Sequence, residues 1–376
     1  MTKKLIYLAN IRLPTEKAHG LQIMKMCEAF AKGGFTVELW IPWRFNRLKE
    51  DPFAFYGLAD ASFVIRRNFC LDLNSLGFLG LSGYLVQTFS FLLAVKIKNL
   101  FNQTNIFYSR EAWASLFFNH CVLEVHDLPK KVKSNNLWLW RRAGKIIVLT
   151  AGLKAELARL GLVEQKILVA PDGVDLEEIT TREDGVACRR LLGLPPKIPI
   201  VMYVGSFGLY DWKGIDVLLE SVKFLSPEIV FVLVGGSAIE IARLKEKYSA
   251  SNIVFKERVN HKLVPFYLKS ADVLVLPNKS GNITSERYTS PLKLFEYLAS
   301  GVPVVASDLP SIREVLNEGN SILVKPNNAS DLAQGISRLL GDPDLSQGLS
   351  RSGLETAKLN TWTKRALNII NFSKIQ

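Results

Sequence analysis

The sequence is poor in the residues that form disulfides and metal sites. Its 376 residues include only four cysteines and four histidines. The cysteines lie far apart and form no C-x-x-C pair, and they are Cys27, Cys70, Cys121 and Cys188. We therefore interpret them as buried cytosolic thiols and not as disulfides or metal ligands. The small number of histidines argues equally against a zinc site.

The N-terminus lacks the apolar run of a signal peptide, and its first residues are typical of a β-strand. The chain does have one long stretch without charge, the 23 residues between Asp72 and Lys96. Length alone would allow a transmembrane helix, but polar residues and three glycines weaken that interpretation. A buried core helix and a membrane-surface or lipid-acceptor face are the alternatives.

The net charge is +12, and almost all of the excess lies in the N-terminal half. Residues 1–170 contain 23 basic and 12 acidic side chains, whereas residues 171–376 contain 24 and 23. Such a surface attracts nucleic acid or anionic membrane. Because no nucleic-acid-binding motif accompanies it, we expect no nucleic-acid partner. The membrane interpretation draws on basic residues that are otherwise ordinary solvated side chains: Arg66, Arg67, Lys96, Lys98, Lys130, Lys131 and Lys133.

Short β-branched runs alternate with helical patterns along the chain. Five runs lie in the first half, at residues 5–9, 36–41, 106–109, 122–125 and 146–149. Six lie in the second half, at residues 200–204, 230–234, 253–255, 273–276, 302–306 and 322–324. Continuous apolar strands separated by helices indicate parallel sheets covered on both faces. We therefore predict an α/β fold of two Rossmann-like domains that face each other across a cleft.

Turn residues mark the join between these domains. They cluster at Val169–Asp175 and continue to Pro195-Pro196. We predict an N-terminal domain of residues 1–170 and a C-terminal domain of residues 171–356. A C-terminal helix of about residues 357–376 is expected to pack back on the first domain. Ligands of doubly wound sheets bind beyond the carboxyl ends of the strands.

The most informative stretch is Ser290–Ser307, SPLKLFEYLASGVPVVAS. It predicts an apolar helix that begins after Ser290-Pro291 and ends at Gly301. The start of such a helix directs free backbone N–H groups and the positive end of the helix dipole toward a phosphate. Glu296 lies within the first two turns and suits the two hydroxyls of a ribose. Together these features describe half of a nucleotide-diphosphate site.

Two loops at strand ends offer further phosphate contacts. Tyr203–Gly214 follows a strand, and its glycines permit a tight turn close to a ligand. Lys213 lies at the following helix entrance and can neutralise a pyrophosphate. Pro14–Gly20 lies between the first strand and a helix predicted over residues 21–31, so Gly20 can bring backbone N–H groups to a phosphate or sugar. The structural alternative for both is an ordinary strand-to-helix loop.

Polar residues also end two other N-terminal strands. His126 and Asp127 follow Glu124-Val125, where a histidine is well placed to touch a substrate, although a structural histidine is the alternative. Arg110 ends another strand and can bind a phosphate or pair with Glu111.

With these motifs, essentially the whole chain resembles the GT-B retaining glycosyltransferases of family four, the group 1 nucleotide-sugar transferases. In the first half the resemblance rests on HG-x-Q (His19, Gly20, Gln22), EVHD-LP (Glu124–Pro129) and V-x-P-x-G-V-D (Val169–Asp175). In the second half it rests on VGSF…KG, LVGG, ADVLVLP and SP-x-K-LFEYLA-x-G-VPVVASD.

The resemblance implies a role for each matching residue. Gly20 and its neighbour His19 approach the diphosphate and donor sugar, and His126 contacts the sugar near the anomeric centre. Lys213 and the Gly205-Ser206 turn hold the pyrophosphate, backbone N–H groups near Ser290, Leu292 and Lys293 cap the phosphate and sugar, Glu296 binds ribose, and Val259 lies near the base. We assign catalysis to His126, Lys213 and Glu296, and the acceptor side to Arg110 and Asp127. The resemblance implies no metal, no other cofactor and no protein nucleophile.

The sequence departs from the family pattern at two positions. Tyr288 stands where the family has a second, sugar-binding glutamate, so Tyr288 or Glu286 would contact the sugar differently. Ser206 stands where an arginine usually follows the glycine of the VG turn. Arg287, Lys293 or Arg110 would supply the missing charge, and Arg287 is our choice because it precedes the phosphate-binding helix.

These observations predict a cytoplasmic enzyme, peripheral to the inner face of the membrane. It would move a sugar from a UDP- or GDP-sugar to a lipid-linked or glycan acceptor with retention of configuration, in cell-envelope polysaccharide or glycolipid synthesis. The acceptor-binding domain would be the N-terminal one, and the nucleotide-sugar-binding domain the C-terminal one. The alternatives are a catalytically degenerate GT-B protein that binds nucleotide or lipid, and a sugar-nucleotide epimerase of the same fold.

Overall fold

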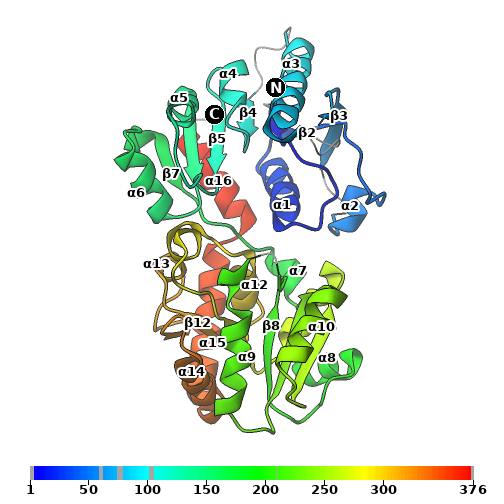
Figure 1. Cartoon of the computed structure of the whole chain (residues 1–376), viewed down its shortest axis with the longest axis vertical. Coiled ribbons are helices and arrows are strands. Elements are labelled where there is room, and N and C mark those ends of the chain that lie inside the picture. The colour runs from blue at the N-terminus through cyan, green and yellow to red at the C-terminus, as the bar shows by residue number, and fades with distance from the viewer. Residues whose placement is uncertain (1–3, 59–61, 74–78, 101–105, 209, 374–376) are drawn as a thin grey trace. The chain divides into compact units, whose positions relative to one another are not determined.

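The computed structural model describes residues 4–58, 62–73, 79–100, 106–208 and 210–373. The chain divides into two compact units (Figure 1). Unit 1 consists of Met1–Pro171 and Trp362–Gln376, and unit 2 consists of Asp172–Thr361. The predicted division into residues 1–170 and 171–356 is close to these limits, with a later return to the first unit at Trp362.

Unit 1 is built on a parallel sheet of seven strands in the order β3-β2-β1-β4-β5-β6-β7. The strands are β1 (Lys4–Leu8), β2 (Thr36–Pro42), β3 (Phe63–Asn68), β4 (Ile106–Ser109), β5 (Val122–Val125), β6 (Lys145–Val148) and β7 (Ile167–Val169). The helices are α1 (Ala18–Lys32), α2 (Pro52–Phe55), α3 (Gly80–Lys98), α4 (Ala114–Phe117), α5 (Ser134–Arg142), α6 (Ala151–Arg159) and α16 (Trp362–Ser373). The central strands are buried except at their first residues, as expected of a parallel sheet with both faces covered.

Unit 2 repeats the plan with six parallel strands in the order β10-β9-β8-β11-β12-β13. They are β8 (Ile200–Val204), β9 (Val230–Gly236), β10 (Ile253–Glu257), β11 (Val273–Leu276), β12 (Val304–Ser307) and β13 (Ile322–Val324). The helices are α7 (Leu176–Ile179), α8 (Gly185–Leu192), α9 (Ile215–Ser221), α10 (Ala238–Lys247), α11 (Val264–Ser270), α12 (Leu292–Ala299), α13 (Pro310–Arg313), α14 (Ala329–Gly341) and α15 (Pro343–Leu359). Two apolar clusters form its core.

These two units confirm the prediction of two Rossmann-like α/β domains. All eleven predicted strands are present, and β3 and β7 are additional. The predicted start of the first helix was wrong, because α1 begins at Ala18 and includes His19 and Gly20 in its first turn. Whether the units face each other across a cleft stays a prediction.

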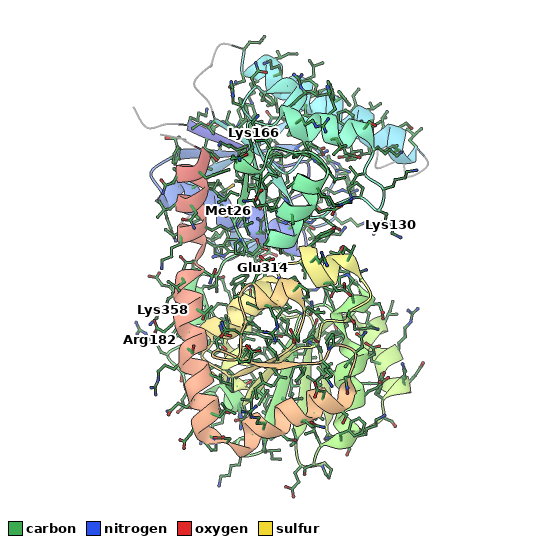
Figure 2. The ribbon with its side chains drawn as sticks, turned by 90° about the vertical axis from the view of Figure 1, so that its left-hand side faces the viewer. Met26, Lys130, Lys166, Arg182, Glu314 and Lys358 are labelled. Carbon is green, nitrogen blue, oxygen red and sulfur yellow. The ribbon has the colours of Figure 1, made fainter. Side chains whose placement is uncertain are left out.

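The C-terminal helix α16 belongs to unit 1 and packs against α1. In Figure 2, Lys358 lies near the end of α15, just before the chain reaches α16. Helix α16 starts later than the predicted residue 357, because α15 continues to Leu359 and ends on Asn360. The isolated bridge between Val174 and Thr361 pairs the beginning and the end of unit 2.

Helix α3 contains most of the charge-free stretch, of which residues 74–78 lie outside the described residues. It is the one helix among the described residues that is long and apolar enough to cross a membrane, and a third of its apolar window is buried. Phe91, Leu92 and Val95 are fully buried in the core of unit 1, as a core helix requires. The other side exposes Val86, Leu93 and Ile97, and Leu81 is exposed near the start of the helix.

Candidate functional site

Helix α12 is fixed against strand β8 by one tyrosine. The Tyr297 hydroxyl accepts a hydrogen bond from the Val204 backbone N–H at 2.8 Å and donates one to the Val204 carbonyl at 3.1 Å. Tyr297 is fully buried, as is Phe295 beside it. The apolar positions of the LFEY segment therefore hold the helix against the sheet, and Glu296, between them, is left partly exposed.

The start of α12 has the features of an anion site. Pro291 is the residue that precedes the first turn, and no side chain caps the helix there. The first backbone N–H groups, at Leu292 and Lys293, therefore have no capping side chain. Ser290 is buried, and its hydroxyl oxygen accepts the backbone N–H of Asp172 at 3.0 Å. Ser290 thus anchors the loop before the helix, in addition to its predicted place near a phosphate.

Lys213 lies in the loop after β8, at the entrance to α9. Its ammonium donates to the Ser206 hydroxyl and to the Ser206 carbonyl, the latter at 3.4 Å. Burial lowers the pKa of Lys213 to about 8, with a further contribution from Arg258, against the opposing effect of Glu240. Gly214 follows with a φ of +71°, and a Cβ there would lie 1.8 Å from the Pro277 carbonyl oxygen. Only glycine fits this turn, which fixes the lysine beside it.

Lys293 is the second lysine of this region. Its ammonium donates to the Tyr203 hydroxyl at 2.8 Å and lies 4.1 Å from the centre of the Tyr203 ring. Burial holds the pKa of Lys293 well below its ordinary value, and the positive charge of Lys213 lowers it further. Neither lysine has an ion-pair partner among the described residues. Two half-buried ammonium groups without a carboxylate partner form a site that an anion such as a diphosphate would stabilise.

Glu296 is held by a histidine that the sequence analysis did not single out. His261 Nε2 lies 3.3 Å from Glu296 Oε1, and His261 Nδ1 lies 3.1 Å from Glu178 Oε1. Burial favours the neutral ring, but the two carboxylates outweigh it and raise the pKa of His261 to about 10. Val259 lies two residues before His261 and packs, half-buried, against the core cluster of unit 2. The Asn260-His261 pair directly after Val259 was the only sequence signal for this contact.

One of the two departures from the family pattern, Tyr288, lies shortly before α12 in the sequence. Tyr288 ends a π-helical turn, Thr284–Tyr288, and is buried. Glu286 in the same turn accepts the Gly281 backbone N–H at 2.7 Å, so it holds the loop. Arg287 is exposed. The role proposed for Arg287 stays a prediction, and Arg258 is a further cation whose charge lowers the pKa of Lys213.

Glycine at position 20 has a clear packing reason within unit 1. A Cβ on Gly20 would lie 2.1 Å from the Tyr56 hydroxyl oxygen and 2.6 Å from Thr15 Cγ2. The Tyr56 hydroxyl in turn accepts the Thr15 N–H and donates to the Thr15 carbonyl. Burial, with Arg110 and Lys17 nearby, lowers the pKa of His19 to about 4. The packing of Tyr56 therefore accounts for glycine in the first turn of α1.

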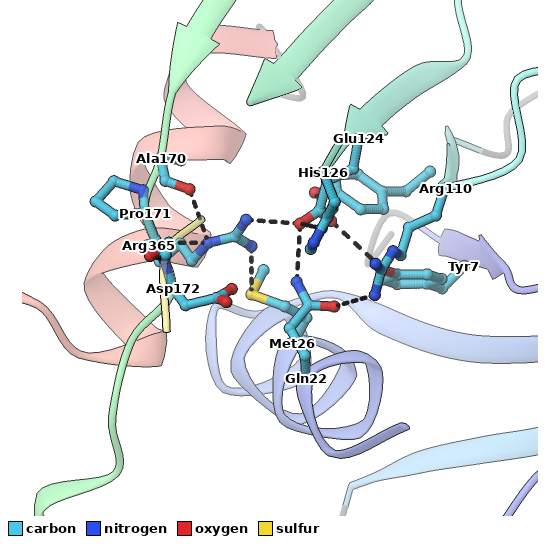
Figure 3. Close-up of polar contacts among 12 residues, drawn as sticks. Tyr7, Gln22, Met26, Arg110, Glu124, His126, Ala170, Pro171, Asp172 and Arg365 are labelled. Atoms are coloured by element: carbon cyan, nitrogen blue, oxygen red, sulfur yellow. Dashed lines mark hydrogen bonds and ion pairs between the residues drawn. The ribbon is translucent and has the colours of Figure 1, made fainter. Parts of the chain in front are cut away.

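His126 lies just beyond β5 and is tied to the buried carboxylate of Glu124 (Figure 3). The His126 Nε2 to Glu124 Oε1 distance is 2.7 Å. Burial and the charge of Arg110 lower the pKa of His126 to about 4, so the ring is neutral. A carboxylate only accepts hydrogen bonds, so Nε2 carries the proton and Nδ1 keeps its lone pair. His126 can therefore accept a hydrogen bond from a hydroxyl at Nδ1.

Glu124 is the centre of a buried polar network. Besides His126, it accepts hydrogen bonds from Gln22 at 2.8 Å, Tyr108 at 2.5 Å, Tyr7 at 3.5 Å and Arg365 at 2.7 Å. Burial would raise its pKa, but Arg365 and His126 outweigh this effect and hold the pKa well below the ordinary value.

Arg365 brings the C-terminal helix into this network. It also donates to the backbone carbonyls of Ala170 and Pro171, at 3.2 and 2.8 Å, and contacts the Met26 sulfur (Figure 3). Arg365 is 4% exposed. Residue 365 is therefore part of the support for His126, although more than two hundred positions of sequence separate them.

Arg110 and Asp127, the two residues predicted on the acceptor side, differ from each other in their surroundings. Arg110 donates to the Gln22 side-chain oxygen at 3.0 Å and so lies beside the Glu124 network. The suggested pair between Arg110 and Glu111 was wrong, because Glu111 is held by Tyr84 at 2.5 Å and by Asn10. Asp127 is exposed, and its carboxylate accepts the Leu128 backbone N–H at 2.8 Å.

The four cysteines are free and buried. In the described part of the chain, no group of three or more His, Cys, Asp or Glu side chains is arranged to hold a metal ion.

Comparisons with known proteins find a family match in the second half of the chain. Residues 198–342 match the family model described as "Glycosyl transferases group 1". The D-inositol 3-phosphate glycosyltransferase of Streptomyces bingchenggensis is 27% identical over 241 residues, covering 60% of this chain and 51% of that protein. The putative teichuronic acid biosynthesis glycosyltransferase TuaC of Bacillus subtilis is 31% identical over 199 residues, covering 52% and 46%. The chain thus spans about half the length of the curated relatives it matches.

Solved structures extend the likeness of fold to the whole chain. The Anabaena protein HepE, crystallised with UDP and glucose, covers 100% of both chains with a TM-score of 0.75 at 16% identity. The two parallel α/β units and this likeness identify the fold as GT-B. The family match of residues 198–342 and the two curated relatives named above are to glycosyltransferases.

Proposed function

We propose that this protein transfers a sugar from a UDP- or GDP-sugar to a lipid-linked or glycan acceptor, with retention of configuration. The observation that carries the proposal is the pair of half-buried lysines, Lys213 and Lys293, around the end of β8 and the start of α12. Their low pKa values mean that an anion binding there recovers electrostatic energy. A diphosphate leaving group also develops negative charge during transfer, which such groups stabilise.

We assign one further residue of each unit to the donor. Glu296, partly exposed and held by His261, would accept the ribose hydroxyls. His126, neutral and with a free Nδ1 lone pair, would accept a hydroxyl of the donor sugar near the anomeric centre. The acceptor hydroxyl would attack from the face that the diphosphate leaves, so we name no protein nucleophile. We also propose that the reaction needs no metal, because the lysines and the start of α12 meet the charge.

Transfer assays test this function directly. Purified protein would be incubated with UDP- and GDP-sugars, with and without lipid-linked and oligosaccharide acceptors, in the presence of EDTA, and product followed by mass spectrometry. We expect consumption of one donor with the retained anomeric configuration in the product by NMR. Nucleotide binding without donor consumption would point to a degenerate GT-B protein, and accumulation of an epimer to an epimerase. No binding of UDP or GDP and no turnover would refute the proposal.

We propose further that unit 1 binds the cytoplasmic face of an anionic membrane, in cell-envelope glycan synthesis. Its exposed apolar side chains include Trp43, Phe45, Phe69 and Leu71 beside the exposed side of α3. The Leu71 backbone N–H donates to the Ser90 hydroxyl of α3, and the Trp43 backbone N–H donates to the Asn68 carbonyl at the end of β3. The loops after β2 and β3 therefore lie close to each other and to α3. Basic residues such as Lys130 project from the same unit (Figure 2). The relation to TuaC supports the envelope setting.

Vesicle sedimentation tests this placement. We expect binding to vesicles of anionic and neutral phospholipid that weakens at high salt, because each lysine or arginine near the surface contributes about 1 kcal/mol. The variant Leu93→Asp should bind less, whereas Ile239→Asp, an exposed apolar position on α10 of unit 2, serves as the matched control. Equal binding by both variants and the parent would refute the assigned surface.

A further inference from the structure

His261 lies between two carboxylates that come from different elements of unit 2. It begins the 3₁₀ turn His261–Leu263, which Asn260 caps by accepting the Lys262 N–H at 3.0 Å. Nδ1 lies 3.1 Å from Glu178 on α7, and Nε2 lies 3.3 Å from Glu296 on α12. The side chains of all three are partly exposed, at 24%, 21% and 16% for His261, Glu178 and Glu296.

This geometry fixes the protonation of the ring. Both ring nitrogens face carboxylates, which accept hydrogen bonds, so both nitrogens must donate and the ring is an imidazolium. The high pKa of His261 agrees with this assignment. Two carboxylates and one imidazolium leave the group with one net negative charge. Glu178 therefore balances the charge of His261, and the charge of Glu296 stays available to a ligand.

The position of Glu178 is itself well defined. Helix α7 begins after Asp175, whose carboxylate accepts the backbone N–H groups of Glu177 and Glu178. Val174 and Ile179 on either side are buried in the core of unit 2. The V-x-P-x-G-V-D motif is thus followed by a short capped helix, which places Glu178 beside His261.

We propose that His261 is a positioning residue for the ribose-binding carboxylate, and that Glu178 is its counter-charge. This inference rests on the proposed function, because it assigns Glu296 to the ribose of a nucleoside diphosphate. The two hydroxyls of a ribose donate to a carboxylate best when its plane is fixed in advance. A hydrogen bond from Nε2 to one oxygen supplies that fixation, since a free glutamate side chain loses rotamer freedom on binding. Glu296, held by His261, would therefore favour ribonucleotides over 2′-deoxyribonucleotides.

The plain alternative is that the trio only ties α7 and the 3₁₀ turn to α12. A structural tie would affect folding and would weaken all ligands of unit 2 alike. A positioning residue would change the discrimination between ribose and deoxyribose. The two roles can therefore be distinguished by the ratio of the dissociation constants for the deoxyribonucleotide and the ribonucleotide. A loss of folded protein does not change this ratio.

Calorimetry on the full chain measures this ratio. The dissociation constants of UDP, 2′-deoxy-UDP, GDP and 2′-deoxy-GDP would be determined for the parent and for His261→Asn, Glu178→Gln and Glu296→Gln. Two matched controls are available: His120→Asn, an exposed histidine of unit 1 whose φ of 60° suits asparagine, and Glu177→Gln, the exposed neighbour on α7. Thermal unfolding of each variant would accompany the measurements.

We expect His261→Asn to weaken the ribonucleotide about tenfold and the deoxyribonucleotide no more than about twofold. Glu178→Gln keeps the size of the side chain. It should reduce the preference for the ribonucleotide over the deoxyribonucleotide by about threefold. The controls should bind as the parent does. A preference unchanged in His261→Asn but lost in Glu296→Gln would overturn this inference alone. Equal weakening of both nucleotides would show a structural tie. Failure of the parent to bind UDP or GDP would overturn the inference together with the proposed function.

Discussion

Removal of the Arg365 side chain should lower the stability of unit 1 more than a substitution of any exposed residue on the same helix. In Arg365→Met, the apolar part of the side chain is kept, but Glu124 loses a charged donor at 2.7 Å. Both groups are nearly inaccessible, at 4% and 1% exposure, so water does not screen the pair. Two backbone carbonyls, of Ala170 and Pro171, lose their donor as well.

The expected magnitude follows from this burial. Removal of one partner of a buried ion pair typically costs about 3–5 kcal/mol, because the remaining charge is left uncompensated. For a unit of about this size, each kcal/mol lowers the melting temperature by about 2–4 °C, so Arg365→Met should lower it by about 6–20 °C. The exposed neighbour Lys364→Met is the matched control and should change stability by no more than about 0.5 kcal/mol.

Calorimetric melting and pH titration provide the assay. The folded-state pKa of Glu124 is depressed, so the stability that its ionisation contributes is present above the unfolded-state pKa. That contribution is lost as pH falls through the folded-state pKa, and Arg365→Met should reduce this acid dependence. The double variant Glu124→Gln with Arg365→Met should cost less than the sum of the two single changes. A loss below about 1 kcal/mol, or additive effects, would refute the coupling of the pair.

Three further outcomes are expected. Glu296→Ala should mainly weaken donor binding and His126→Ala should mainly slow transfer, and equal small effects on KM and kcat would contradict the assigned roles. The affinity for nucleoside diphosphate should decline as pH rises through about 8, where Lys213 loses its charge, and Lys213→Met should abolish this pH dependence in calorimetry. Gly214→Ala should destabilise unit 2 by more than about 1 kcal/mol, because its φ is positive and the new Cβ meets the Pro277 carbonyl; an unchanged melting temperature would contradict this account.

Most of the strands were predictable from the sequence. Every strand of unit 2 and the five central strands of unit 1 appear as short β-branched or apolar runs, although β2 contains Glu38 and β5 contains Glu124. The two strands that were missed, β3 and β7, are the two edges of the sheet in unit 1. Strand β3 exposes Val64, Arg66 and Arg67, and β7 has only three residues. A strand this exposed or this short lacks the apolar run that the other strands show, including β10 and β13 at the edges of unit 2.

The phosphate side of the candidate site was also visible in the sequence, since its parts are local. The start of α12, the position of Glu296 about one turn later and the tight turn at Gly214 each depend on neighbours within a few residues. Helix boundaries, caps and positive φ angles are set by such short-range forces. Periodicity and turn residues therefore sufficed to place these groups on their elements.

The sequence by itself determined two series of parallel strands, the local form of the loops proposed to bind phosphate and the identity of Glu296, Lys213 and His126 as candidates. Only the tertiary structure decided which side chains support them. Glu124 meets Arg365, and Glu296 meets Glu178 through His261, across separations that no local pattern encodes. These partners are brought together by the order of the strands and by the burial of their helices. The free energy of a buried charge depends on what surrounds it in space, and its neighbours along the chain do not reveal this.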